Sequence, residues 1–278
     1  MTKASFVDIP FRGRDVSIEY AWISPAHTAH PAPLVVFLHE GLGSLAMWKD
    51  YPQCLCDAGG YRGLAFSRAG YGRSTPRRAG ERWSPDFMEA QAREFLPRLF
   101  ERLGVCAGTT RPWLFGHSDG GSIALIHAAT FPDAVAGVVA VAPHIFVEDL
   151  SIRSIAAARD AYRSTDIRSR LARYHDDPDS AFWGWNDVWL DPAFRAWSID
   201  AMLRYLQCPI LAVQGKDDEY GTLAQVEGIR RRAPQTEVVV LSRCGHSPHR
   251  DRPEALTRAV LDFIARHKEA LTCHGETQ

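Results

Sequence analysis

Hydrophobic residues fall along the chain in short continuous runs that alternate with helical patterns. Residues 34–38 read LVVFL, and further strand-like runs occupy residues 63–66, 113–115, 135–141, 210–213 and 238–241. A short apolar run bounded by turn residues is typical of a strand buried on both faces of a parallel sheet. Residues 16–23 (VSIEYAWI) instead alternate apolar and polar positions, which predicts an edge strand with one buried face.

Helical patterns separate these strands. In residues 86–103 apolar side chains recur on one helical face after a Ser84-Pro85 start signal. Pro97 within this segment predicts a kink, because proline has no N–H and its ring crowds the preceding turn. Further helices are predicted over residues 120–130, 223–232 and 253–267. Alternating strands and helices indicate βαβ units and therefore an α/β fold with a mainly parallel central sheet flanked by helices.

Residues 144–206 break this alternation. They contain no clear strand, have the pattern of several short helices, and hold four of the eight tryptophans: Trp183, Trp185, Trp189 and Trp197. Ligands of parallel sheets bind at the carboxyl ends of the strands. We therefore predict a helical cap (lid) at 144–206, inserted after strand 6 into a core domain of residues 1–143 and 207–278. The alternative is an extra helical layer that only packs on the core.

Composition and charge limit the classes of partner. The 278 residues carry 32 Lys and Arg against 33 Asp and Glu, a net charge of −1, which argues against nucleic acid or an anionic membrane as a partner. The longest mainly apolar run, residues 134–142, is far shorter than the ~20 residues of a membrane-spanning helix. The N-terminal residues lack the hydrophobic core of a signal peptide. We expect a cytoplasmic protein that acts on a small molecule, in an oligomeric state that the sequence leaves open.

The cysteines and histidines do not have metal-ligand spacing. The chain has no C-x-x-C pair, no H-x-x-x-H pair and no H-E-x-x-H motif. We expect reduced thiols at all six cysteines: Cys54, Cys56, Cys106, Cys208, Cys244 and Cys273. Neither a metal nor an organic cofactor is expected.

The strongest chemical signal is GHSDGG at residues 116–121, a G-x-S-x-G pattern centred on Ser118. It lies between the strand-like RPWLF and the helix-like SIALIHAAT, and a sharp turn at such a junction lifts the serine hydroxyl above the sheet. The glycines at both ends leave room for the tight backbone. The following helix directs its N-terminus at the site, which favours developing negative charge. Ser118 is therefore predicted to be a nucleophile.

A serine hydroxyl needs a base to take its proton. His246, in the segment CGHSP after the strand at 238–241, is the predicted base. His249 is the second choice, or else a surface or pocket-rim residue.

The base in turn needs an acid that fixes its tautomer. Residues 215–218 (GKDD) follow the strand at 210–213, so their carboxylates leave the sheet at the same edge as Ser118. Asp218 is preferred for its G-x-x-D spacing. Asp217 is the alternative, or else a solvated loop charge or helix cap.

A negative oxygen formed on a substrate carbonyl needs two backbone N–H donors. One is predicted at Asp119, directly after the nucleophile. The second is predicted in the loop HEGLGS at residues 39–44, at Gly41 or alternatively at Leu42. We interpret His39 as a structural anchor of this loop rather than as a base.

Taken together, these residues resemble the α/β-hydrolase superfamily, in its capped, esterase-like branch. The motifs cover nearly the whole chain: HEG at 39–41 with Trp48, RAGYGRS at 68–74, GHSDGG, GKDD, and GHSPHRDRPE at 245–254. The resemblance implies an α/β-hydrolase fold with a cap and a triad in the family's chain order, Ser118, Asp218, His246. In that family the segment matching 68–74 shapes the core and the pocket floor.

Two positions depart from the family pattern. Glu40 stands where the family usually has glycine, and we expect its carboxylate to face solvent or pair with an arginine. The alternative is that it polarises the site or selects the substrate. Asp119 stands where a hydrophobic or small residue is common, and we expect its side chain to pair with an arginine of the cap.

The resemblance implies a serine hydrolase that cleaves a carboxylic ester through an acyl-enzyme intermediate. The aromatic cap favours a small-to-medium apolar or aromatic substrate. The expected substrate-binding residues are Leu42, His117, His144, Trp183, Trp185 and Trp189.

Alternatives on the same triad are a thioesterase, a lactonase or a carbon–carbon bond hydrolase, although the last usually carries asparagine where His117 stands. Ser118 argues against the dehalogenases and epoxide hydrolases of this fold, which use an aspartate nucleophile. The alternative from another class is a ligand-binding sensor with little turnover.

Overall fold

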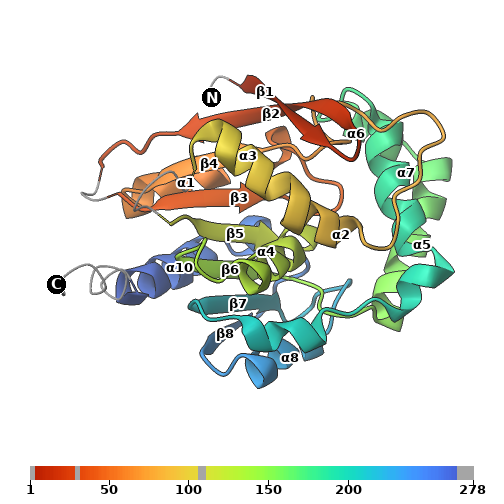
Figure 1. Cartoon of the computed structure of the whole chain (residues 1–278). Coiled ribbons are helices and arrows are strands. Elements are labelled where there is room, and N and C mark those ends of the chain that lie inside the picture. Colours follow the sequence, from red (N-terminus) through yellow and green to blue (C-terminus); the bar gives the residue numbers. More distant parts are fainter. Residues whose placement is uncertain (1–3, 29–31, 106–110, 268–278) are drawn as a thin grey trace.

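The computed structural model describes residues 4–28, 32–105 and 111–267. These residues form an eight-stranded sheet with the order β1-β2-β4-β3-β5-β6-β7-β8 (Figure 1). The strands are β1 Ser5–Phe11, β2 Arg14–Ile23, β3 Leu34–Leu38, β4 Arg62–Phe66, β5 Trp113–His117, β6 Gly137–Val141, β7 Ile210–Gly215 and β8 Thr236–Leu241. β2 pairs antiparallel with β1 and β4, and the other neighbours are parallel. The predicted α/β class is confirmed.

Residues 16–23 do lie in a strand, β2, but the prediction that this strand forms the edge of the sheet is wrong. β1, which the sequence pattern did not indicate, pairs outside β2 and forms the edge. In β1 Ile9 is the one fully buried side chain, and Phe6 is 51% exposed. Val7, Ile9 and Phe11 do alternate with exposed Asp8 and Pro10, but the run is short and contains a proline, which counts against a strand.

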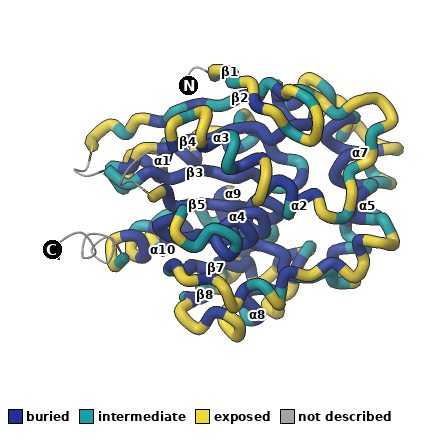
Figure 2. The backbone as a smooth tube through the Cα atoms, viewed as in Figure 1, coloured by how far each residue is buried: buried dark blue, intermediate teal, exposed yellow. Residues whose placement is uncertain are grey.

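The four central strands β3, β5, β6 and β7 are buried at every position, as Figure 2 shows in dark blue. Helices cover both faces of the sheet, so neighbouring residues of a strand enter two different apolar clusters: Val36 and Leu114 one, Phe37 and Phe115 the other. The helices are α1 Tyr51–Gly59, α3 Leu96–Leu103, α4 Asp119–Thr130, α8 Ala224–Arg232, α9 Pro248–Asp251 and α10 Pro253–His267. α1 and α10 contact each other, and α4 packs on β5 and β6.

The helix predicted over residues 86–103 begins as α2, Phe87–Ala90, and continues to the end of α3. A π turn, Gln91–Phe95, lies directly before Pro97. Since Pro97 has no N–H and its ring crowds the carbonyl four residues back, a wider turn accommodates it without ending the helix.

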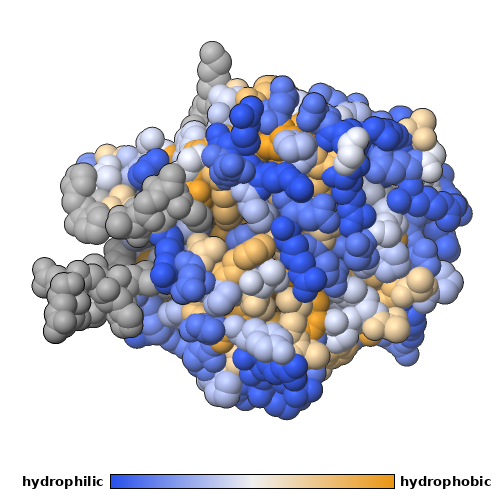
Figure 3. Space-filling view, viewed as in Figure 1, coloured by the Kyte–Doolittle hydropathy of each residue, from blue (hydrophilic) through white to orange (hydrophobic). Residues whose placement is uncertain are grey.

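The segment between β6 and β7 folds into α5 Asp149–Ser164, α6 Ile167–Leu171, α7 Pro178–Trp189 and two 3₁₀ turns, η3 Pro192–Ala196 and η4 Asp200–Tyr205. α5, α6 and α7 contact one another and stand beyond one end of the strands, at the right of Figure 1. The outer surface on that side is mostly hydrophilic (Figure 3). By contrast, η4 packs on α4 and α8, beside the sheet.

None of the described helices is long and apolar enough to cross a membrane. The described cysteines, Cys54, Cys56, Cys208 and Cys244, are free thiols. Cys106 and Cys273 lie outside the described residues.

Candidate active site

Ser118 stands on a sharp turn between β5 and α4. Its backbone has φ 52° and ψ −120°, a conformation that is costly for a residue with a side chain and is typical of functional turns. The turn can close because the residues two positions before and after Ser118 are glycines. A Cβ on Gly116 would lie 2.2 Å from the carbonyl oxygen of Gly120, and one on Gly120 would lie 2.1 Å from that of Leu38.

Three predicted residues meet at this turn in one hydrogen-bonded chain. Oγ of Ser118 lies 2.9 Å from Nε2 of His246, and Nδ1 of His246 lies 2.9 Å from each carboxylate oxygen of Asp218. They come from the ends of β5, β8 and β7, which lie at the same edge of the sheet. With Asp218 accepting from Nδ1–H, Nε2 is left free to accept the serine proton.

The carboxylate of Asp218 is held by further donors. Gln214 Nε2 donates to one oxygen at 2.6 Å, and the backbone N–H groups of Tyr220 and Gly221 donate to the other at 2.8 and 3.2 Å. Burial alone would raise the pKa of Asp218, but the bonds from His246 and Tyr220 keep it below its ordinary value. Burial alone would lower the pKa of His246, but Asp218 raises it above the ordinary imidazole value.

The two alternatives for base and acid lie elsewhere. Asp217 is exposed. His249 is buried between Trp48 and His117, with ring centroids 5.1 and 4.9 Å away. Burial lowers the pKa of His249 to about 3, so this ring is neutral. It packs against His117 and is not part of the hydrogen-bonded chain of Ser118, His246 and Asp218.

The loop after β3 brings Gly41 against α7, in the segment between β6 and β7. A Cβ on Gly41 would lie 2.2 Å from Nε1 of Trp185, so only glycine permits this approach. Leu42 contributes its carbonyl oxygen to Nε2 of His175 at 3.0 Å. His39 bonds the carbonyl oxygen of Glu40 at 2.7 Å, as expected of an anchor for this loop.

The side chain of Asp119 is fully buried, and its expected pairing with an arginine of the cap is wrong. Trp189 of α7 donates its indole N–H to Oδ1 at 3.2 Å, and Arg68, from the loop after β4, has Nη2 3.9 Å from Oδ2. Burial raises the pKa of Asp119 to about 6, against the opposing charge of Arg68. Helix α7 therefore bonds directly to the residue that follows Ser118.

Glu40 is turned inward more than outward, with 17% of its side chain exposed. Its oxygens lie 3.5 Å from Nδ1 of His117 and 3.9 Å from Nη2 of Arg250. Burial alone would raise its pKa, but the contact with His117 holds it well below the ordinary value. Nε2 of His117 donates to the carbonyl oxygen of His246 at 2.6 Å, so Glu40 reaches the triad through His117.

The remaining predicted substrate-binding residues separate into two groups. Three of them lie near the triad: the ring of His144 lies 5.8 Å from His246 and 5.0 Å from Trp189, Trp189 bonds to Asp119, and Trp185 lies against Gly41. Trp183 instead packs on Tyr162 of α5, with ring centroids 5.5 Å apart. Its indole also carries the guanidinium of Arg163 at 5.2 Å.

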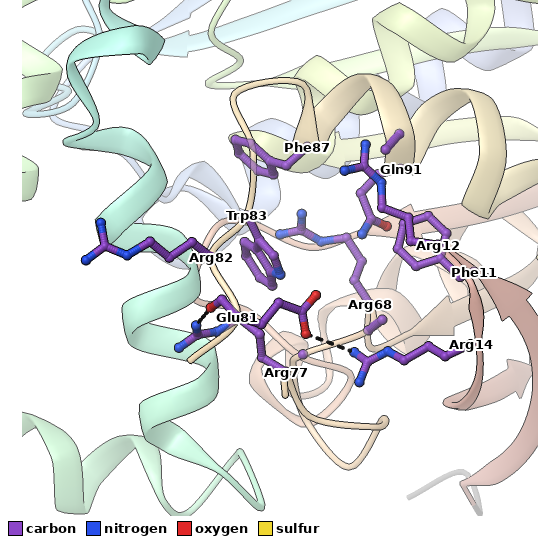
Figure 4. Close-up of a pocket in the computed structure, with 13 residues that line it drawn as sticks. Phe11, Arg12, Arg14, Arg68, Arg77, Glu81, Arg82, Trp83, Phe87 and Gln91 are labelled. Carbon is purple, nitrogen blue, oxygen red and sulfur yellow. Dashed lines mark hydrogen bonds and ion pairs between the residues drawn. The ribbon is translucent and has the colours of Figure 1, made fainter. Parts of the chain in front are cut away.

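A cavity rich in arginine lies between the β1–β2 turn and α2 (Figure 4). The residues that line it include Arg12, Arg14, Arg68, Arg77, Arg82, Trp83 and Gln91, but not Ser118, Asp218 or His246.

The sequence analysis missed Arg68, Gln214 and Trp48 as neighbours of the site. Trp48 and Arg68 stood in recognised motifs, but their partners are distant in sequence.

Comparisons with known proteins agree with this fold. A family model described as the alpha/beta hydrolase family matches residues 35–259. Two curated relatives carry the name 2-succinyl-6-hydroxy-2,4-cyclohexadiene-1-carboxylate synthase. The one from Enterobacter sp. (strain 638) is 24% identical, covering 84% of this chain and 92% of its own length. The one from Yersinia pseudotuberculosis is 26% identical, covering 87% and 90%.

Solved structures share the fold at low sequence identity. The proline iminopeptidase of Mycobacterium smegmatis superposes with a TM-score of 0.75 at 17% identity, covering 96% of this chain and 99% of its own. The enol-lactonase of Burkholderia xenovorans gives 0.69 at 20%, covering 93% and 100%, and a thermophilic esterase of Thermogutta terrifontis gives 0.69 at 21%, covering 95% and 99%. With its sheet, its serine turn and a family model matched over most of its length, the chain belongs to the alpha/beta hydrolase family.

Proposed function

We propose that the protein is a serine hydrolase that cleaves a carboxylic ester through an acyl-enzyme intermediate. The observation that carries the proposal is the unbroken chain of hydrogen bonds from Asp218 through His246 to Ser118. A serine at hydrogen-bond distance from an imidazole that is itself oriented by a buried carboxylate is the arrangement that activates a hydroxyl for attack.

In the proposed reaction, Oγ of Ser118 attacks the ester carbonyl while Nε2 of His246 takes its proton. The carbonyl oxygen becomes negative and accepts hydrogen bonds from the backbone N–H groups of Gly41 and Asp119. His246 then returns the proton to the departing alcohol, which leaves the acyl group on Ser118. Water, deprotonated by His246, attacks the acyl-enzyme and releases the acid.

We propose that helices α5 to α7 form a cap over this site and that the substrate is small to medium in size and apolar or aromatic. Trp185 on the Gly41 loop and Trp189 bonded to Asp119 support both points, because they put indole rings over the proposed donors. Indole rings supply flat apolar surface for such substrates.

The test is hydrolysis of a graded panel of p-nitrophenyl esters, from acetate to dodecanoate plus benzoate, by wild type and by Ser118→Ala. We expect turnover by wild type, highest for the shorter or aromatic acyl groups, and a loss of at least a thousandfold in the variant. Ester turnover that survives in Ser118→Ala would reject Ser118 as the nucleophile.

A second candidate is a reaction on a cyclic carboxylate, for which the name of the two curated relatives is the supporting observation. If folded wild type turns over no ester in the panel, the same pair of proteins is assayed with lactones, thioesters and cyclohexadiene carboxylates. Stabilisation by a ligand without any turnover would instead favour a sensor.

A further inference from the structure

The peptide group that joins Glu40 to Gly41 is held by hydrogen bonds to its carbonyl oxygen. The carbonyl oxygen of Glu40 accepts three hydrogen bonds: from Nδ1 of His39 at 2.7 Å, from Nη2 of Arg68 at 2.8 Å and from the backbone N–H of Gly43 at 3.1 Å. The backbone N–H of Arg68 donates to Nε2 of His39 at 3.0 Å, which leaves the imidazole proton on Nδ1. Burial, together with the charge of Arg68, holds the pKa of His39 well below its ordinary value, so the ring is neutral.

The other end of this peptide is the N–H of Gly41, one of the two proposed oxyanion donors. The C=O and N–H of one peptide belong to a single conjugated group. Hydrogen bonds to its oxygen draw electron density from the nitrogen and strengthen the N–H as a donor, by about 10–30% per bond. A bond from a charged donor is stronger than one from a neutral donor. Arg68 therefore acts on the side of the peptide opposite to the reacting carbonyl.

Arg68 is buried, and its ion pair with Asp119 is a long one without a hydrogen bond. The residue is 1% exposed, and its Nε has no hydrogen-bond partner among the described residues. The nearby carboxylate of Asp119 is 3.9 Å away, beyond hydrogen-bond distance. The ring of Tyr71 faces the guanidinium carbon at 4.7 Å. In Figure 4 the guanidinium of Arg68 lies beside the ring of Trp83, away from the charged rim at Arg14 and Glu81.

Burying a cation without a hydrogen-bonded carboxylate is costly for stability. A buried arginine that only stabilised the fold would be expected to hold a carboxylate with two parallel bonds. Arg68 instead directs its hydrogen bond to one backbone carbonyl, that of Glu40. The unfavourable burial of the Arg68 guanidinium is explained if its charge acts on the Glu40–Gly41 peptide.

We propose that Arg68, supported by His39, is a positioning residue of the oxyanion hole: its guanidinium holds the Glu40–Gly41 peptide in place and strengthens the Gly41 N–H. This inference rests on the proposed function. Because the negative oxygen exists only in the tetrahedral state, the effect of Arg68 falls on kcat rather than on substrate binding.

The test compares Arg68→Met with Arg77→Met. Arg77 is the matched control, because it lines the same cavity but donates to the carbonyl oxygens of Ser180 and Glu81, not to the Gly41 loop. For each variant we measure kcat and KM on the best p-nitrophenyl ester. We also measure the inhibition constant of a trifluoromethyl ketone, which forms a negatively charged adduct with an active serine.

Removing an entire oxyanion donor costs about 10²–10³ in kcat, and weakening one costs less. We expect Arg68→Met to lower kcat roughly 10–100-fold, to change KM less than threefold, and to raise the inhibition constant by the same factor as kcat falls. Arg68→Lys keeps the charge and should recover part of the loss. Arg77→Met should stay within twofold of wild type on all three measures.

A kcat for Arg68→Met within twofold of the Arg77→Met value would overturn the inference, as would a loss of kcat without the matching loss of inhibitor affinity. If circular dichroism shows that the Met variant does not fold, Arg68→Lys decides by the same match between kcat and inhibition. Ser118→Ala separates the two levels: ester turnover that survives in it refutes the proposed function, whatever Arg68 does.

Discussion

Replacing Asp218 by asparagine tests how the proposed acid controls the proton on His246. The backbone N–H groups of Tyr220 and Gly221 both point at Oδ1 of Asp218, so the amide oxygen of an asparagine must take that position. The amide NH₂ then occupies the Oδ2 position, 2.9 Å from Nδ1 of His246 and 2.6 Å from Nε2 of Gln214. Nδ1 is also 2.9 Å from the Oδ1 position, but the oxygen there already accepts two backbone N–H groups. The NH₂ group therefore donates to Nδ1 and leaves the imidazole proton on Nε2, facing the serine that needs an acceptor.

The wrong tautomer costs about 10⁴ in kcat in other Ser-His-Asp enzymes, equivalent to ~5.4 kcal/mol of transition-state stabilisation. We expect a loss of that size for Asp218→Asn in steady-state hydrolysis of a p-nitrophenyl ester near pH 8. Asp217→Asn, a change at an exposed neighbour, is the matched control and should stay within twofold of wild type. A loss of less than tenfold in Asp218→Asn would refute the role given to Asp218.

Three further predictions follow from the same geometry. The rate kcat/KM should rise with pH through a midpoint above the ordinary imidazole value of 6.5, because only neutral His246 accepts the serine proton and its pKa is raised; a midpoint below that value in the pH–rate profile contradicts this. Glu40→Gln should move that midpoint to lower pH, because the negative charge of Glu40 helps to raise the pKa of His246; an unchanged or higher midpoint counts against it. Gly120→Ala should destabilise the fold by roughly 1–3 kcal/mol in urea unfolding, since its Cβ would meet the carbonyl of Leu38. Gly221→Ala, where the nearest atom is 3.4 Å away, is its control, and equal stability of the two variants would be inconsistent with the close packing of the elbow.

The strands and the candidate triad could be predicted because their signals are local. The buried strands β3, β5 and β7 are uninterrupted apolar runs in the sequence, and residues of the candidate site follow each of them within a few positions. Parallel strands carry such residues to one edge of the sheet. The structure accordingly brings Ser118, Asp218 and His246 together, from positions that the motifs specified.

What could not be predicted depends on contacts between distant parts of the chain. Trp189 and Arg68, which meet Asp119, lie on α7 and in the loop after β4, and no spacing in the sequence relates them to it. For the same reason the sequence could not separate the roles of Trp183 and Trp185, which are two residues apart on one helix. Trp183 packs on Tyr162, whereas Trp185 lies against Gly41. β1 escaped detection because its short alternation, Val7, Ile9 and Phe11, is interrupted by Pro10.

The measurement that tests the central claim most directly is the mass of the protein during turnover. Wild type is mixed with a p-nitrophenyl ester, quenched in acid within milliseconds to seconds, and digested for peptide mass spectrometry. The account predicts an acyl group on the peptide that contains Ser118, formed at the rate of the p-nitrophenol burst and absent in Ser118→Ala. Ester turnover with the acyl group on another residue, or persisting in the variant, would contradict it.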